Sequence, residues 1–349
     1  MRQSSNNQLT KEVIKPVKRR DILISILGTF ILVLLINFAA GWYLQKNTPN
    51  RGYFLINQKW EMLLGLKQPV NWLILGDSSC NQGIIPSVLN EKLNVTSLNL
   101  CTIGDMLALN DAWMLDKYIK KLGVPQNILL VHVYDVWHRS ANPRLLGKIP
   151  LNLPNLQKLQ PQISLSFKQL IQFFWWRYFP LNSESSSLAN LLKHPIESYE
   201  QAKSFKLEEN GFMIWEKADP YGVEVDTKRH IKFTKDNRFK LSSPNHQALE
   251  KIAALAQHYN FNVYLANSPI HQKLSENEEF QAYYAQVKAT LSTYAAQSEQ
   301  IHYISEPVTF SKYQMQNSDH LIYTSAKVYT QTVISQIFSA SQSNTVSQK

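Results

Sequence analysis

The sequence predicts an α/β protein with a central parallel sheet, a large central insertion and an N-terminal transmembrane helix. Three observations support this. Short apolar runs of strand length alternate with helical stretches from about residue 70 onward, which is typical of βαβ units and a parallel sheet. The alternation stops between about residues 140 and 233 and then resumes. An uncharged, largely apolar stretch covers residues 22–44 and is long enough to cross a bilayer as a helix.

The composition is that of a globular chain with one large domain. Of the 349 residues, 44% are hydrophobic and 18% are charged, which fits a folded protein rather than a disordered one. The net charge is +10, and part of the surplus is concentrated at Arg2, Lys11, Lys15, Lys18, Arg19 and Arg20. This concentration in the tail argues against nucleic-acid binding. The modest remainder suits an anionic envelope surface or a polyanionic glycan.

Residues 22–44 are expected to form a transmembrane signal anchor. Trp42 and Tyr43 stand near the end of the stretch, where an interfacial aromatic belt belongs. The basic residues precede it, so the positive-inside rule predicts a single-pass protein of the inner or cytoplasmic membrane. Its N-terminus would be cytoplasmic and the rest periplasmic or extracellular. A cleaved signal peptide is the alternative, since Ala39-Ala40-Gly41 offers small residues near the end of the stretch.

This assignment divides the chain into five parts. We expect a basic cytoplasmic tail at 1–21, the anchor at 22–44, a juxtamembrane connection at 45–68, one domain at 69–339 and a disordered tail at 340–349. Within the domain, strands are predicted at 72–75, 95–100, 127–135, 261–267 and 301–304. Helices are predicted at 84–93, 107–122, 249–259 and 278–296, with a last helix ending near residue 337.

The segment from about residue 140 to 233 is predicted to be an inserted cap or subdomain. Prolines are clustered there, at Pro143, Pro150, Pro154 and Pro161. The segment also carries an aromatic run at residues 173–179. This run has three candidate roles: the insertion's own core, a wall for an acyl or sugar group, or an amphipathic element lying on a membrane.

The two cysteines, Cys80 and Cys101, follow the first and second predicted strands. If these strands are neighbours, the side chains could lie together and form a disulfide in an oxidising compartment. Two buried thiols are the simpler expectation. Neither cysteine has the spacing of a metal site, and no metal or cofactor is expected.

The stretch that offers chemistry is the polar turn after the first strand. An apolar strand at 72–75 runs directly into Gly76, Asp77 and Ser78. Open α/β sheets keep their sites at the carboxyl ends of their strands, so this turn would deliver a serine hydroxyl to such an edge. The same residue types are ordinary turn formers, so a purely structural turn is the competing interpretation. Ser79 is the alternative nucleophile.

Three short blocks, in this order, resemble the SGNH (GDSL-type) hydrolase superfamily. They are Gly76-Asp77-Ser78 after the first strand, Gly104 after the second, and Asp319-His320-Leu321 before the last helix. With the N-terminal anchor and the long insertion, the chain is similar to the membrane-anchored SGNH-like proteins of envelope polysaccharide O-acetylation and teichoic acid D-alanylation. The resemblance implies an SGNH/flavodoxin-like three-layer fold over about residues 69–337.

The resemblance, together with the chemistry of serine, implies roles for these residues. A serine hydroxyl becomes a good nucleophile only when a base takes its proton, so Ser78 is the expected nucleophile and His320 the general base. The N–H groups of Gly104 and Ser78 would bind the oxyanion. The residue that orients His320 would be Asp319 or Asn317, and Glu306 is a further candidate.

Two positions depart from the pattern of the family. The acid normally found three residues before the histidine is replaced by Asn317, while Asp319 is adjacent to the ring that it would orient and could reach it only in an extended turn. The third block normally supplies an Asn, where this chain has Tyr134-Asp135. The hydroxyl of Tyr134 is a substitute donor, whereas the charge of Asp135 would repel an oxyanion.

Together these inferences predict an anchored extracytoplasmic SGNH-like serine enzyme, an O-acyltransferase or acetylesterase acting on an envelope polysaccharide. The expected partners are this glycan, the membrane through residues 22–44 and, by the resemblance, a membrane-bound O-acyltransferase; no nucleic acid is expected. Two alternatives remain. One is a non-catalytic SGNH-fold scaffold or glycan-binding accessory of such an acyltransferase. The other is a GDSL-type lipase or esterase with the aromatic insertion as a lipid-facing cap.

Overall fold

The structure is a computed structural model that describes residues 18–150, 166–205 and 207–346. Five parallel strands form its central sheet in the order β2-β1-β3-β4-β6. Their bounds are β1 Trp72–Gly76, β2 Ser97–Asn99, β3 Asn127–His132, β4 Asn262–Asn267 and β6 Ile301–Ile304. This strand order is that of flavodoxin-like doubly wound sheets, whose winding reverses between β1 and β3. The predicted parallel sheet is confirmed.

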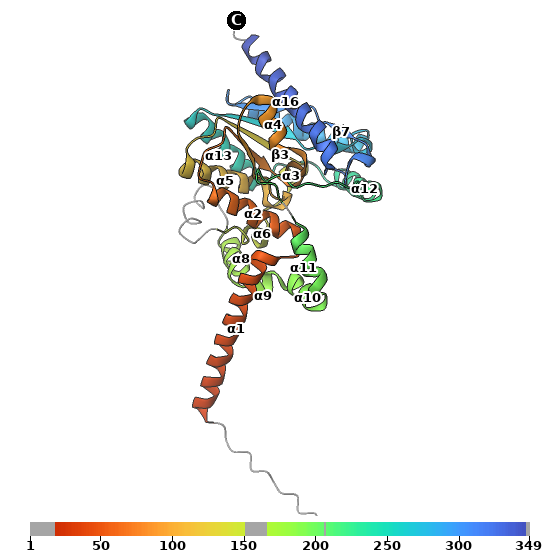
Figure 1. Ribbon diagram of the computed structural model, residues 1–349. Coiled ribbons are helices and arrows are strands. Elements are labelled where there is room, and N and C mark those ends of the chain that lie inside the picture. The colour runs from red at the N-terminus through yellow and green to blue at the C-terminus, as the bar shows by residue number, and fades with distance from the viewer. Residues whose placement is uncertain (1–17, 151–165, 206, 347–349) are drawn as a thin grey trace, which may run out of the picture.

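Helices cover both faces of the sheet, because successive strand residues point to opposite sides (Figure 1). In β1, Leu73 and Leu75 pack with one hydrophobic cluster, and Trp72 and Ile74 pack with the other. The first cluster is completed by α2 (Arg51–Gly65), α5 (Leu107–Leu122), α13 (Ser243–Tyr259) and α15 (Glu278–Ala295). The second is completed by α4 (Pro86–Leu93) and α16 (Tyr323–Val346). Burial on both faces explains why the strands are continuous apolar runs.

Short elements shape the carboxyl edge of the sheet. They are α3 (Ser78–Gly83), η1 (Gly104–Met106), η2 (Val136–His138), α14 (Gln272–Ser275), η4 (Lys312–Gln314) and a small parallel pair formed by β5 (Ile270–His271) and β7 (Thr309–Phe310). The insertion returns to this edge through α12 (Pro220–Asp236), which contacts α14, α15 and η4.

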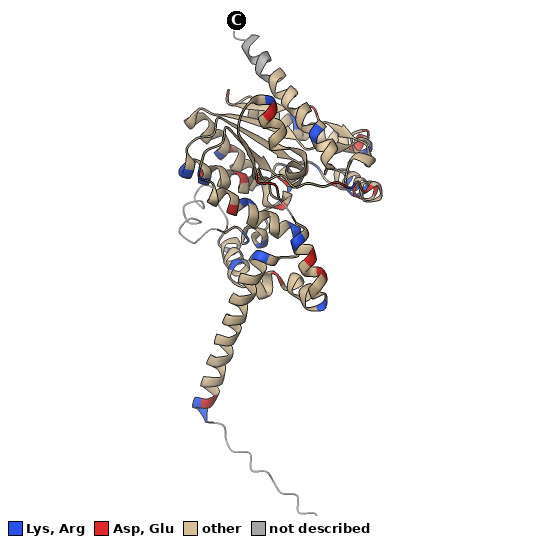
Figure 2. Ribbon diagram, in the orientation of Figure 1, with Lys and Arg blue, Asp and Glu red and all other residues tan. Residues whose placement is uncertain are grey.

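The N-terminal helix α1 (Arg19–Asn47) projects from the α/β body, at the opposite end of the molecule from the end of α16 (Figure 1). Among the described residues it is the helix long and apolar enough to cross a membrane. Figure 2 shows no charged residue on it beyond its first turn until it nears the body. This helix is suited to be a membrane anchor or a signal sequence.

The other described helices of the insertion lie around the C-terminal half of α1 and form what we call the collar. The collar consists of α6 (Pro143–Leu146), α8 (Phe167–Tyr178), α9 (Pro180–Ser183), α10 (Ser185–Lys193) and α11 (Pro195–Ser204). Asn37 of α1 binds it at two points: its Nδ2 donates to the Tyr178 carbonyl oxygen at 2.6 Å, and its Oδ1 accepts from the Leu181 N–H at 3.3 Å.

Two expectations about chain organisation differ from the structure. Residues 45–68 are more than a connection, because Asn50 caps α2 by accepting from the Tyr53 N–H, and Trp60 of α2 is fully buried. The last helix does not end near 337; it continues to Val346, through most of the expected disordered tail. Residues 1–17 of the expected cytoplasmic tail, and 347–349, lie outside the described residues.

The aromatic run is buried at one position and exposed at others. Phe173 is fully buried inside the collar, whereas Trp175 and Tyr178 are each 47% exposed. The run therefore supplies only part of the insertion's own core, and its other face is open.

Candidate active site

The turn after β1 is built so that a serine starts a helix at the carboxyl edge of the sheet. Gly76 has a φ of 143°, and an added Cβ would overlap the carbonyl oxygen of Val131, so the position requires glycine. Asp77 is extended and caps α3, whose first residue is Ser78. Ser78 is partly exposed. It lies beside the β1–β3 reversal point, where doubly wound folds place their ligands.

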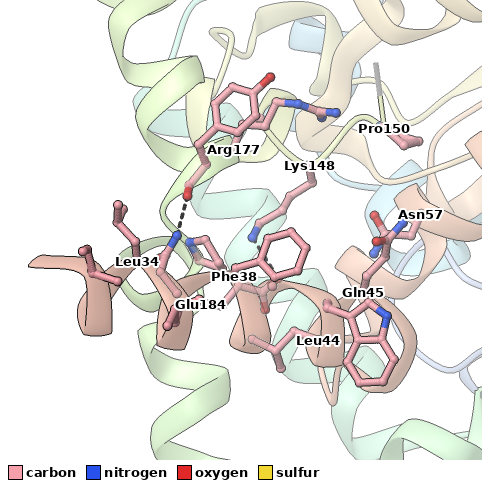
Figure 3. A pocket seen from close by; sticks show the side chains of 17 residues that line it. Leu34, Phe38, Leu44, Gln45, Asn57, Lys148, Pro150, Arg177 and Glu184 are labelled. Carbon is pink, nitrogen blue, oxygen red and sulfur yellow. Dashed lines mark hydrogen bonds and ion pairs between the residues drawn. The ribbon is translucent and has the colours of Figure 1, made fainter. Parts of the chain in front are cut away.

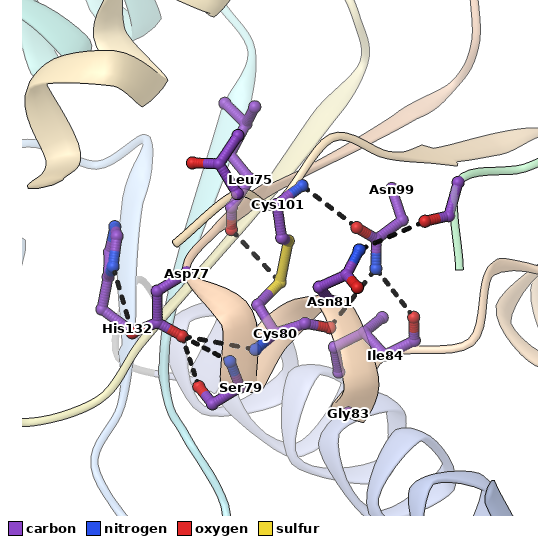
Figure 4. Close-up of a disulfide and its surroundings, with 12 residues drawn as sticks. Leu75, Asp77, Ser79, Cys80, Asn81, Gly83, Ile84, Asn99, Cys101 and His132 are labelled. Atoms are coloured by element: carbon purple, nitrogen blue, oxygen red, sulfur yellow. Dashed lines mark hydrogen bonds and ion pairs between the residues drawn. A yellow bond between two sulfur atoms is a disulfide. The ribbon is translucent and has the colours of Figure 1, made fainter. Parts of the chain in front are cut away.

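Asp77 holds this turn in place and distinguishes the two candidate serines. Its carboxylate accepts from the Ser79 N–H at 2.8 Å, the Ser79 hydroxyl at 2.5 Å and the Val133 N–H at 2.7 Å; Figure 4 shows the bonds to the α3 turn. Ser79 is fully buried, and its hydroxyl is already engaged. Of the two serines, Ser78 is therefore the one that is open to a substrate.

Beneath the turn, His132 is buried between two carboxylates. Its Nε2 lies 2.6 Å from Asp111 Oδ2, and its Nδ1 lies 3.5 Å from Asp77 Oδ2. Burial alone would lower the pKa of His132, but Asp111 and then Asp77 outweigh it and raise this pKa to about 9. Asp77 is also buried, yet His132, Ser79 and the Val133 N–H hold the pKa of its carboxyl far below the usual range. Asp77 is therefore a permanent charge next to Ser78.

His320 is held by both of its expected neighbours. Its Nδ1 lies 2.5 Å from Asp319 Oδ1 and 2.7 Å from Asn317 Oδ1. The adjacent Asp319 therefore does reach the ring, as the sequence allowed if the turn were suitable. Asn317 Oδ1 also accepts from the N–H groups of Asp319 and His320, and this tight loop turns the Asp319 side chain back onto the ring. Asn317 shapes the loop, and Asp319 supplies the charge.

The pKa of the Asp319 carboxyl agrees with its role as the charged partner of His320. Burial raises the pKa of the Asp319 carboxyl, but the charge and hydrogen bond of His320 outweigh burial and leave the pKa lowered. Glu306, the third candidate, pairs with Lys288 at 3.0 Å, and its side chain is 74% exposed. Glu306 is thus committed to the surface and is not the partner of His320.

The helix that Ser78 starts packs against the helix that follows His320. Helix α3 contacts α16, which begins three residues after His320. The charge of Asp77 also acts on Asp319, where it opposes ionisation. His320 Nε2 is buried, and among the described residues it has no hydrogen-bond partner. The Ser78 hydroxyl does not bond to it in this structure, and catalytic hydrogen bonds of this kind are often long before substrate binds.

Arg139 adds a positive charge that sequence reasoning missed. A Cβ added to Gly104 would lie 2.7 Å from Arg139 Nη1, so the guanidinium covers the glycine. Arg139 also donates to both oxygens of Asp135, at 3.0 and 2.8 Å, and to Asp105 at 3.0 Å. The expected repulsion from Asp135 is therefore neutralised. The signal that could have revealed the pair is the acid–base spacing of four residues.

Burial alone would lower the pKa of Arg139. The negative charges of Asp135, which acts most strongly, and of Asp105 and Asp77 outweigh burial and raise this pKa above its usual value. The guanidinium is a fixed cation near the turn that carries Ser78.

Tyr134 is not free to act as an additional oxyanion donor. It is buried, and its hydroxyl lies 2.6 Å from His230 Nδ1 of α12. Behind His230 stands Asp226, 3.6 Å from Nε2, which also accepts from the Ser318 hydroxyl at 2.6 Å. The insertion thus contacts both Tyr134, two residues after β3, and the loop that carries His320. Sequence reasoning missed His230 and Asp226, whose spacing of four on a helix was the available signal.

Cys80 and Cys101 form a disulfide at the same edge, with their Cα atoms 5.8 Å apart (Figure 4). The expectation of two buried thiols is wrong. The bond joins α3 to the segment that follows β2, because β1 and β2 are adjacent and parallel.

The structure thus defines an α/β protein with a five-stranded parallel sheet and an apolar N-terminal helix. No family model matches the chain, and a search of the curated proteins found no match. Across residues 18–150, 166–205 and 207–346, no three His, Cys, Asp or Glu side chains are grouped as metal ligands would be.

Proposed function

We propose that this protein is a membrane-anchored serine acyl-ester enzyme that acts outside the cytoplasm on hydroxyl groups of an envelope polysaccharide, as an O-acyltransferase or an acetylesterase. The observation that carries the proposal is the arrangement at one sheet edge: a partly exposed serine that starts a helix, and a histidine with one ring nitrogen held by a buried carboxylate. The other ring nitrogen has no partner in the described part of the chain. A glycine lies under a guanidinium nearby.

The chemistry follows from these groups. His320 Nε2 takes the proton of the Ser78 hydroxyl as Oγ attacks the acyl carbonyl, and the Asp319 carboxylate stabilises the imidazolium. The N–H groups of Ser78 and Gly104 stabilise the oxyanion, and each such donor contributes about 3 kcal/mol. Arg139 adds an electrostatic contribution beside Gly104. His320 then returns the proton to the leaving group, and a sugar hydroxyl or water attacks the acyl-serine.

Two further features support a location at a membrane and outside the cytoplasm. The uncharged surface of α1 suits an anchor that keeps the domain at a membrane. The disulfide between Cys80 and Cys101 suits an oxidising compartment outside the cytoplasm. The acceptor is proposed to be a polysaccharide because of the resemblance of the three sequence blocks.

A second candidate is a non-catalytic scaffold or glycan-binding accessory of a membrane-bound O-acyltransferase. The observation that favours it is the lack of a hydrogen bond between Ser78 and His320. The two candidates differ in one measurable property, the reactivity of Ser78.

The test is labelling of the full-length chain with a fluorophosphonate probe, together with hydrolysis of an aryl acetate. We expect the probe to modify Ser78, as mapped by peptide mass spectrometry, and both labelling and turnover to vanish in Ser78→Ala. Ser335→Ala is the matched control, because Ser335 is an exposed serine on α16. Labelling at Ser79 would reassign the nucleophile. An unlabelled wild type that also fails to turn over the ester would refute the enzyme proposal and leave the scaffold.

A further inference from the structure

A groove runs between α1 and the collar, away from the candidate active site. It has a volume of about 750 Å³. One wall is apolar and comes from α1, with Leu34, Leu35 and Phe38 among its residues. The other side carries Lys148, Arg177 and Glu184 from the collar region, as Figure 3 shows. The groove is thus apolar along one wall and charged along the other.

The apolar wall belongs to the proposed membrane span. Leu35 is 62% exposed and Phe38 is 76% exposed, and both lie in the uncharged part of α1. The lining residues of α1 run from Ile31 to Gln45, which corresponds to about 21 Å of helix. This exceeds half the thickness of a hydrocarbon core of about 30 Å. An acyl chain could therefore enter the groove from one leaflet without crossing water.

The collar exposes an apolar stripe of its own beside the groove. Phe167, Ile171, Trp175 and Tyr178 of α8 are all exposed, and their spacing of four, four and three residues places them on one helix face. Large exposed apolar patches on soluble surfaces are rare and mark binding or membrane contact. A helix of this kind at the level of the C-terminal half of α1 suits the membrane interface.

The charged side of the groove is suited to an anion. Lys148 Nζ lies 2.8 Å from Glu184 Oε1 and 3.0 Å from the Ser183 hydroxyl. Arg177 donates through Nη1 to the Ile149 carbonyl oxygen, but its Nε is buried and has no hydrogen-bond partner among the described residues. Two cations face one carboxylate, so the lining is net positive. Arg177 is partly exposed and lines the groove together with Lys148, and a guanidinium and an ammonium group are both good partners for phosphate oxygens.

We propose that this groove binds an anionic phospholipid of the bilayer, with one acyl chain along α1 and its phosphate on Arg177 and Lys148. This inference rests on the membrane anchoring in the proposed function but is independent of the serine chemistry. The bound lipid would fasten the collar to α1 and so set the height of the α/β domain above the membrane.

The experiment is native mass spectrometry of the full-length chain in mild detergent, with phosphatidylglycerol or phosphatidylcholine of identical acyl chains. We expect one phosphatidylglycerol per chain to be retained, with an affinity at least about tenfold above that of phosphatidylcholine, which corresponds to about 1.4 kcal/mol. Replacing both cations, by Lys148→Gln with Arg177→Gln, removes this preference. Leu35→Trp fills the apolar wall and lowers retention of both lipids without touching the charges.

Arg238→Gln with Lys327→Gln is the matched control, because these cations are exposed on the α/β body and outside the groove. Equal retention of the two lipids by the wild type, or undiminished phosphatidylglycerol binding without the groove cations, would overturn the proposal. So would cross-linking of a photoreactive residue at position 35 to residues 151–165 or to a second copy of the chain in place of lipid. Carbonate extraction tests the anchoring and fluorophosphonate labelling tests the serine, so failure of the proposed function is recognised separately.

Discussion

Stability should fall as the pH rises from neutrality toward 9, because of the buried His132. Its pKa is about 9 in the folded chain against 6.5 for an ordinary histidine. The imidazolium therefore stabilises the fold fully below pH 6.5, and this contribution is lost as the pH rises through 9. A pKa difference of this size corresponds to about 3 kcal/mol. The physical cause is that deprotonation leaves Asp77 and Asp111 without the cation that they share.

The assay is thermal unfolding of the full chain in detergent, followed by circular dichroism between pH 6 and 9. About 3 kcal/mol corresponds to a fall in melting temperature of roughly 5–10 °C. His132→Gln should melt lower at pH 7, because it leaves two buried carboxylates unneutralised, and its melting temperature should change little over this pH range. If that variant does not fold, Asp111→Asn is the substitute, and its loss of stability should begin at a lower pH. Parallel pH profiles for wild type and both variants would refute the reasoning.

Three further predictions concern the edge of the sheet. Gly104→Ala places a methyl group 2.7 Å from Arg139 Nη1 and should lower kcat/KM for an aryl acetate at least about tenfold by displacing the guanidinium. The control is Gly65→Ala, which meets nothing within 4 Å and should leave kcat/KM unchanged. Equal kcat/KM values for the two variants would contradict a role for Arg139 above Gly104. Asp319→Asn should lower kcat by about 10²-fold or more while Ser78 stays accessible to probe, since the imidazolium loses its carboxylate; an unchanged kcat would show that Asn317 suffices. Replacing Cys80 and Cys101 together by Ser should lower the free energy of unfolding by about 3 kcal/mol, because the disulfide closes a loop of 21 residues. Dithiothreitol should lower the melting temperature of the wild type to that of the double variant. An unchanged melting temperature of the wild type in dithiothreitol would speak against the disulfide.

Local patterns predicted the sheet and most of its helices well. Strand β1 was recognisable as an apolar run that ends in a glycine turn, and α5 was predicted with the bounds that the structure has, because its apolar residues repeat with helical period and Gly123 ends it. The prediction failed where the same residue types are compatible with two different local structures. Residues 45–68 were expected to be a connection, yet Asn50 among them is the N-cap of α2. The polar C-terminal tail was expected to be disordered, yet α16 continues through it to Val346.

The candidate site was only partly predictable. Ser78, Gly104 and His320 could be named because each follows a strand or precedes a helix with its own sequence signal. The adjacent Asp319 was expected to reach its neighbour's ring only in an extended turn. It does reach the ring, because Asn317 accepts two backbone N–H groups and closes the loop, a detail of backbone conformation that residue spacing does not encode.

By itself, the sequence determined the elements whose signals lie within a few residues: the uncharged span of α1, the alternation of strands and helices, and the serine at the start of α3. Only the tertiary structure decided the partners of these elements. It brought Arg139 over Gly104, His230 against Tyr134, and His132 between Asp77 and Asp111. These residues are far apart along the chain and meet because parallel strands bring their carboxyl ends to one edge and the insertion folds back over it. Charge and burial at such contacts depend on packing, which no local pattern specifies.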